Sequence, residues 1–412
     1  MLIRFICFIL TIINLQAQNL TLKANKATQA LNAKSFVPAF TMDGKPVGAV
    51  SGATNSAATP VSSLTASQNN FNVIGALQNI LNRLKNREGQ NLPEFAPNRI
   101  LHPSDKDDEN IPKLRQILQI LGYLQKATDS PFFDMELETA VKAFQASHCV
   151  NADGIIGDDT KIRLNWTYAK RIKMLNDSIE KLKTLVLTDR TAIVNIPTYT
   201  LHAFEGQNLV MRMKIIVGQQ KRPTPQMTSY INIIEFNPVW VVPHTILFED
   251  KIPKIIEDVN VLKESNIQVF DHDDNEVYAD DVDWAEVDEH HFPYVLKQKS
   301  GSTNALGRLR FNLLNKEDIY LHDTPLRNLF KKCSRALSSG CIRLEKPMKL
   351  AAWLLDKKMG DVKDIIATKE TEEYKLDKNM TVYITYLPVW VEEDGRVIWG
   401  DDPYNLNLGL VP

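Results

Sequence analysis

The residues best suited to chemistry lie in one short segment, Tyr320 to Glu345. It contains His322 and, nineteen residues later, Cys341, which follows a Ser-Ser-Gly turn. A thiol is a good nucleophile only as a thiolate, and a neighbouring histidine can take its proton and lower its pKa. Gly340 permits the unusual dihedrals of a sharp turn, so that amides around it can converge as an oxyanion site. The segment therefore predicts acyl transfer with Cys341 as nucleophile and His322 as base.

Neither residue type is diagnostic by itself. A lone cysteine is more often a small buried apolar residue, and a lone histidine is more often structural. The chain has four cysteines, Cys7, Cys149, Cys333 and Cys341, too few and too irregularly spaced for a disulfide-dense scaffold or, in the mature protein, a four-cysteine zinc site. If Cys7 is removed with a signal peptide, three remain, and at least one thiol stays without an intramolecular partner.

The elements that must position this pair follow residue 185, where the pattern changes to a period of two. Alternating or continuous apolar segments predict a β-rich domain at residues 186–375 that is mostly antiparallel and possibly mixed. These segments are AIVNIP, TLHAFE, LVMRMKIIVG, YINIIEFNPVWVVP, RLRFNLL and DIYLHD. Residues 376–412 are expected to form a β-hairpin, with its turn at Asp394-Gly395, and a tail.

An insert interrupts this domain at about residues 247–303, and we expect it to be mainly helical because IPKIIEDVNVLKE has helical spacing. From Glu249 to Glu289 it carries fifteen acidic residues against three basic ones. Such a segment is either a solvated flap or a lid that selects substrate.

A helical region is predicted at residues 71–185. Apolar residues recur at helical spacing over residues 71–84, 111–121, 135–147 and 166–185, and a further short helix begins at Thr160. Gly122, Gly154 and Gly157 mark turns between them. Residues 103–165 are expected to form a separate small module.

The N-terminal residues predict export. Residues 1–17 place Arg4 before an apolar run and end at a small residue, Ala17, which is typical of a secretory signal peptide. Taken as a membrane anchor, the run is too short to span a bilayer. Residues 18–70 are rich in Ala, Ser, Thr, Asn and Gln and are expected to be a low-complexity tether.

Charge excludes one class of partner. The chain has 48 basic and 50 acidic residues, a net charge of −2, so it has no overall positive field to attract nucleic acid or anionic lipid. We expect no nucleic-acid partner, no metal and no cofactor.

Two parts of the chain resemble known families. The segments LRQILQILGYL, AVKAFQ and ADGIIGDDT resemble the small three-helix peptidoglycan-binding domain. YLHDTP followed by SRALSSGCIRLEKP resembles the active-site segment of L,D-transpeptidases of the YkuD fold. The second likeness includes VNIPTYTLHAFE, IIVGQQKRPTP, FNPVWVVP and NALGRLRF upstream and TVYITYLPVW downstream. Together the resemblances cover about residues 100–405 and are similar to the large subclass with a peptidoglycan-binding domain and an inserted lid.

The resemblance implies a cysteine enzyme that attacks the amide before the terminal D-Ala of a tetrapeptide stem, releases D-Ala and passes the acyl group to an amine, giving a 3-3 cross-link. Carried over by position, Cys341 is the nucleophile, His322 the base and Gly340 part of the oxyanion site. The backbone carbonyl of Asp323 would orient the histidine. The resemblance also implies that carbapenems acylate Cys341.

Four further residues are candidate substrate contacts. Arg343 is interpreted as holding the loop or meeting a stem carboxylate, with the loop role favoured. Tyr320 and Trp240 either line the cleft or, as aromatics in apolar strands more often do, belong to the core. Ser339 departs from the family, in which many members have histidine there, and is interpreted as a mark of the subclass.

The predicted fold is therefore multidomain: a three-helix peptidoglycan-binding module, then a β-rich catalytic domain with a lid. The expected partners are peptidoglycan stem peptides and glycan, at the cell wall of an exported, periplasmic protein without a transmembrane anchor after signal cleavage. An L,D-carboxypeptidase that uses water as acceptor and a non-catalytic wall-binding protein stay open as alternatives. A papain-like protease is discarded because His322 precedes Cys341.

Overall fold

The computed structural model describes residues 72–107 and 109–406. The predicted signal peptide, the predicted tether and the last six residues lie outside this part of the chain. Among the described residues, no helix is both long and apolar enough to cross a membrane.

Five helices form the helical region: α2 (Val73–Lys85), α3 (Asn110–Ile120), α4 (Met135–Ser147), α5 (Asp158–Leu164) and α6 (Tyr168–Lys183). They lie within about two residues of the predicted helices. Asn72, Asp134 and Thr167 precede three of them, and each side chain accepts a hydrogen bond from the backbone amide three residues on, as N-caps do. Local sequence signals therefore determine where these helices begin.

The helical region contains two separate apolar cores. Helices α3, α4 and α5 enclose one of them, with Leu114, Val141, Phe144 and Leu164 fully buried. Helices α2 and α6 instead pack against the C-terminal hairpin, β14 (Val389–Val391) and β15 (Val397–Trp399), whose turn lies at the predicted Asp394-Gly395. Only the first core belongs to the small module.

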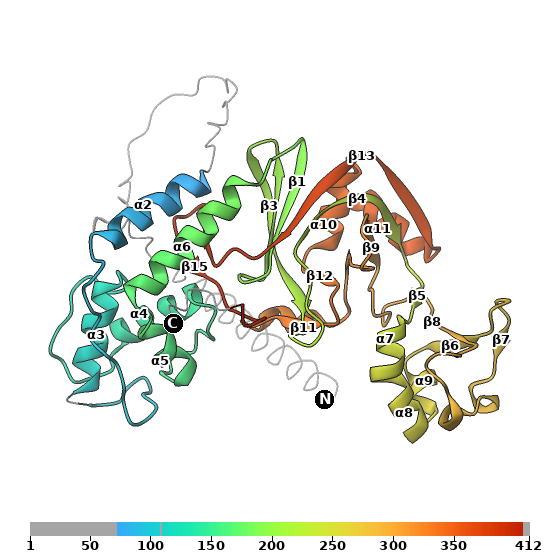
Figure 1. Ribbon diagram of the computed structural model, residues 1–412, viewed down its shortest axis with the longest axis horizontal. Helices are drawn as coiled ribbons and strands as arrows, with labels where there is room; N and C mark the ends of the chain where they lie inside the picture. Colours follow the sequence, from blue (N-terminus) through green and yellow to red (C-terminus); the bar gives the residue numbers. More distant parts are fainter. Residues whose placement is uncertain (1–71, 108, 407–412) are drawn as a thin grey trace, which may run out of the picture. The chain divides into compact units, whose positions relative to one another are not determined.

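A closed mixed barrel follows (Figure 1). Its strands are β1 (Arg190–Asn195), β2 (Thr200–Glu205), β3 (Asn208–Gly218), β4 (Met227–Phe236), β9 (Leu309–Leu313), β10 (Tyr320–His322), β12 (Ile342–Leu344) and β13 (Glu372–Thr385). The order β3-β12-β10-β9-β4-β13-β1-β2 closes because β2 also pairs with β3, and a short strand, β11 (Ala336–Ser338), adds to β3. The β1–β13, β10–β12 and β3–β11 pairs are parallel and the others antiparallel.

The barrel extends beyond its predicted end at residue 375, which falls inside β13. This strand pairs with β4 and β1 up to Thr385. Its register shifts between Lys375 and Met380, where charged residues interrupt the alternation. Helices α10 (Pro347–Leu354) and α11 (Met359–Thr368) share the barrel's apolar core.

The insert between β4 and β9 has an apolar core of its own that includes Trp240, Ile255, Val269 and Leu296. It begins with β5 (Trp240–Val241), α7 (His244–Ile246), a π-helical turn (Leu247–Lys251), α8 (Ile252–Glu257) and α9 (Asn260–Glu264). The strands β6 (Ile267–Phe270), β7 (Glu276–Val277) and β8 (Val295–Gln298) then form an antiparallel sheet with β5. Two short 3-10 helices, Ala279–Asp281 and Trp284–Glu286, lie between β7 and β8. The insert is thus mainly helical, as expected, but it also contains short strands that were not predicted, because such short strands give little periodic signal.

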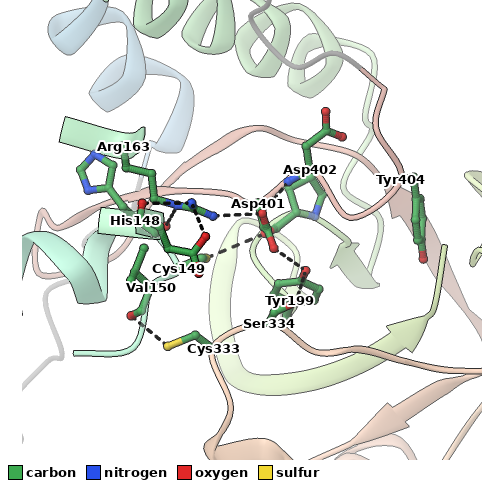
Figure 2. A network of polar contacts seen from close by, with 12 residues as sticks. His148, Cys149, Val150, Arg163, Tyr199, Cys333, Ser334, Asp401, Asp402 and Tyr404 are labelled. Carbon is green, nitrogen blue, oxygen red and sulfur yellow. Dashed lines mark hydrogen bonds and ion pairs between the residues drawn. The ribbon is translucent and has the colours of Figure 1, made fainter. Parts of the chain in front are cut away.

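Polar contacts join the small module to the barrel (Figure 2). Asp401 accepts hydrogen bonds from Arg163 at 3.2 Å and from the Tyr199 hydroxyl at 3.0 Å. The Cys333 thiol donates to the Val150 carbonyl at 3.0 Å. Cys149 and Cys333 are both free thiols. Burial raises the pKa of Cys149 to about 12, so this thiol is a poor nucleophile at neutral pH.

Candidate active site

Two neighbouring parallel strands bring the predicted pair together. In the β10–β12 register, Leu321 lies opposite Ile342 and His322 opposite Arg343. Leu321 and Ile342 are fully buried in the barrel core. Because successive side chains of a strand point to opposite faces, Tyr320, His322, Cys341 and Arg343 share the other face.

His322 is a buried, neutral histidine. Its pKa is lowered to about 3, first by burial and then by the nearby Arg343, with Arg310 a smaller cause. The backbone of Asp323 acts in the opposite direction. Only a hydrogen-bond acceptor stabilises the imidazolium, so the group that acts in this direction is the Asp323 carbonyl. Nδ1 of His322 nevertheless has no hydrogen bond of good geometry among the described residues.

The Asp323 backbone is held firmly in place. Its amide donates to the Leu309 carbonyl at 2.8 Å, and its carboxylate accepts from the Arg308 amide at 3.0 Å and pairs with Arg327 at 3.2 Å. At Gly307, where φ is +63°, a Cβ atom would lie 2.4 Å from the Asp323 carboxylate. A side chain at position 307 would therefore clash with this carboxylate, and only glycine fits there.

The Cys341 thiol is protonated in this state. Its sulfur lies 3.6 Å from the Asp318 carbonyl, and burial raises its pKa. Tyr320 acts against burial through its backbone and hydroxyl, and so do the positive charges of Arg310 and Arg343. The resting site therefore holds a neutral thiol and a neutral imidazole, surrounded by groups that stabilise a thiolate once it forms.

The turn before Cys341 is fixed by hydrogen bonds. Gly340 has φ +115°, which L side chains rarely adopt, and a Cβ there would lie 3.2 Å from Ile319 Cδ1. Ser338 Oγ donates to the Cys341 carbonyl at 2.6 Å, and Thr224 Oγ1 donates to the Gly340 carbonyl at 2.6 Å. The Gly340 amide donates to Ser338 Oγ in a long hydrogen bond of 3.3 Å.

Two family models match parts of this chain. Residues 189–384 match the model of the L,D-transpeptidase catalytic domain of the YkuD family, and residues 107–164 match that of a peptidoglycan-binding domain. The chain contains an L,D-transpeptidase catalytic domain. A Haemophilus influenzae protein named L,D-transpeptidase is 37% identical over 215 residues, which cover 51% of this chain and 43% of that protein. The chain thus aligns with less than half the length of this curated relative.

Solved structures include similar proteins at low identity. An L,D-transpeptidase from Stackebrandtia nassauensis is 14% identical with a TM-score of 0.27, covering 69% of this chain and 95% of that one. One from Xylanimonas cellulosilytica is 13% identical with a TM-score of 0.24, covering 70% and 98%.

Two arginines of the L,D-transpeptidase domain flank His322. Arg343 lies beside it on β12; its side chain is partly buried, and its guanidinium makes no hydrogen bond or ion pair to any described residue. Arg310 lies on its other side on β9, 4.4 Å above the Tyr320 ring, and pairs with Glu235 at 3.5 Å. Arg310 was not among the residues predicted for the site. The alternation in RLRFNLL could have placed it on the polar face, but only strand pairing brings it to the histidine.

The two aromatic candidates, Trp240 and Tyr320, differ in how they relate to the thiol. Trp240 is buried in the apolar core of the insert. Tyr320 packs against the same core, lies edge-on to the His322 ring at 5.6 Å, and has its pKa raised, first by burial and then by Cys341. Tyr320 therefore joins the insert to the thiol, and the Trp240 side chain meets the Tyr320 hydroxyl from the core of the insert.

Ser339 faces the insert side of the site. Its hydroxyl accepts a hydrogen bond from Arg222 at 3.0 Å, a residue that the sequence analysis did not single out. Among the described residues, no group of His, Cys, Asp and Glu has the arrangement of a metal site.

Proposed function

We propose that this chain is a peptidoglycan L,D-transpeptidase that works through an acyl-enzyme on Cys341. The observation that carries the proposal is the β10–β12 pairing, which puts the thiol and a neutral imidazole on one face of the matched catalytic domain. The donor is a tetrapeptide stem, and the bond attacked is the amide before its terminal D-Ala.

The chemistry uses one base for both half-reactions. His322 accepts the Cys341 proton as sulfur attacks the amide carbon, and the oxyanion forms near the Gly340 turn. The carbon–nitrogen bond then breaks, and the imidazolium gives its proton to the departing D-Ala nitrogen. An acceptor amine attacks the thioester carbon, and its proton returns through His322 to sulfur as the new amide leaves.

Arg343 is proposed to meet a carboxylate of the stem. The sequence favoured a role in holding the loop, but a loop-holding arginine would use its donors on the loop. The Nε of this partly buried guanidinium lacks any hydrogen bond, and burying a charged group without a partner is costly. A substrate carboxylate supplies the partner, and Arg310 adds positive charge on the other side of His322.

The remaining proposals concern place and partners. The module matched at residues 107–164 is proposed to hold the enzyme on glycan or stem peptides, and the L,D-transpeptidase domain implies action outside the cytoplasm. Export through residues 1–17 and a periplasmic location fit this activity.

Incubation of the purified chain with disaccharide tetrapeptide, followed by mass analysis, tests the proposal. A cross-linked dimer with release of D-Ala supports transpeptidation. Tripeptide alone identifies an L,D-carboxypeptidase, and recovery of unchanged donor with folded enzyme supports the non-catalytic wall-binding alternative.

A further inference from the structure

Arg222 contacts both the insert and the nucleophile turn. It lies in the loop at residues 219–226, between β3 and β4. Nη1 donates to Ser339 Oγ at 3.0 Å and to Asp250 at 2.6 Å, and Nη2 donates to Asp250 at 2.9 Å. Glu249 accepts from Nε at 3.1 Å and from Nη2 at 2.5 Å. All five guanidinium hydrogens are used, so the side chain has one defined orientation.

The loop that carries Arg222 also braces the turn through other groups. The Gln219 amide donates to the Ser338 carbonyl at 2.8 Å, and Thr224 Oγ1 donates to the Gly340 carbonyl at 2.6 Å. With the Arg222–Ser339 bond, the loop binds three consecutive residues immediately before Cys341. A shift of this loop would therefore move the residues next to Cys341 as well.

On the insert side, both acceptors lie in the π-helical turn Leu247–Lys251. The side chains of Glu249 and Asp250 make no hydrogen bond or ion pair to any described residue other than Arg222. Their side chains are 60% and 43% exposed, and exposed ion pairs contribute little to stability. Single π-helical turns occur frequently at functional sites. The contact is therefore better explained by the geometry it imposes than by the stability it adds.

We propose that Arg222 is a positioning residue that couples the insert to the nucleophile turn. Asp250 and Glu249 orient its guanidinium, the guanidinium holds Ser339, and Ser339 keeps the turn in the conformation that presents Cys341 to His322. Movement of the acidic insert on or off a substrate thus alters the chemical step as well as access to the site. The effect on catalysis rests on the proposed function, but the mechanical coupling does not.

A double-mutant cycle on Asp250→Asn and Ser339→Ala tests the coupling without substrate. The readout is amide hydrogen exchange of the peptide spanning residues 336–344. Asp250→Asn is expected to speed exchange there by roughly three- to tenfold, the size of one modest hydrogen bond, and to add nothing when Ser339→Ala is already present. Arg222→Lys should reproduce Asp250→Asn, because a lysine ammonium has only three donors and no planar fork.

The matched control is Glu257→Gln, which removes the same charge from the same insert at an exposed side chain with no ion pair to a described residue. It should leave exchange in this peptide unchanged. Equal exchange in wild type and Asp250→Asn, or additive effects of Asp250→Asn and Ser339→Ala, would overturn the coupling.

Single-turnover acylation at saturating tetrapeptide then tests its catalytic consequence. Asp250→Asn should lower the acylation rate constant by the same three- to tenfold factor, again only when Ser339 is present. If wild type is not acylated, the proposed function fails while the exchange result stands. If wild type is acylated and Asp250→Asn changes only the tetrapeptide concentration that gives half-maximal acylation, the insert controls access alone and the inference is wrong.

Discussion

Burial of His322 predicts a specific loss of stability in acid. The unfolded chain binds a proton on this imidazole below its ordinary pKa of 6.5, whereas the folded protein binds it only near pKa 3. Because the folded state binds fewer protons, the contribution of His322 to the free energy of unfolding is fully present above about pH 6.5. It is lost progressively as the pH falls toward 3. From about pH 7 to about pH 5 the loss from this one group is about 2 kcal/mol, at about 1.4 kcal/mol for each pH unit below 6.5.

Urea unfolding of wild type and His322→Gln at both pH values measures this contribution. His148 and His202 are also buried with lowered pKa values, and both are present in the two proteins, so their contributions cancel. The free energy of unfolding should fall by about 2 kcal/mol less in the variant than in wild type. An equal fall in the two proteins would refute the view that burial keeps His322 neutral.

The other predictions concern the nucleophile and its turn. Cys341→Ala should abolish turnover and carbapenem labelling, whereas Cys149→Ser and Cys333→Ser should retain most activity, as product analysis and peptide mapping will measure. Loss of activity in Cys333→Ser with activity retained in Cys341→Ala would reverse the assignment. Ser339→Ala should slow acylation roughly tenfold or less, since it loses one hydrogen bond from Arg222. A thousandfold drop in stopped-flow acylation would mean that this hydroxyl takes part in proton transfer. Gly340→Ala should cost about 1–3 kcal/mol in urea unfolding because its φ of +115° strains any side chain. Unchanged stability and acylation would show that the turn needs no glycine.

The helices were predictable because their signals are local. Apolar residues at helical spacing and the caps at Asp134 and Thr167 mark α4 and α6 in the sequence. The same holds for the hairpin turn at Asp394-Gly395. The short strands of the insert were not predictable, because segments such as Glu276–Val277 are too short to show a period.

The site was predictable only where its residues are close in sequence. His322 and Cys341 fall in one segment, so their pairing could be expected before the fold was known. Arg310 and Arg222 reach the site through strand pairing and a loop contact across 117 positions from Arg222 to Ser339, which no local pattern encodes. The proposed role of Arg343 rests on its guanidinium having no partner among the described residues, and the sequence alone does not show which contacts a side chain makes.

Mass mapping of the trapped acyl-enzyme tests the central claim most directly. Wild type is mixed with disaccharide tetrapeptide, quenched in acid within a single turnover, digested and mapped. We predict an adduct equal to the donor minus D-Ala, carried as a thioester on the peptide that contains Cys341 and absent from Cys341→Ala. Release of D-Ala with no adduct, or an adduct on a different residue, would contradict the account.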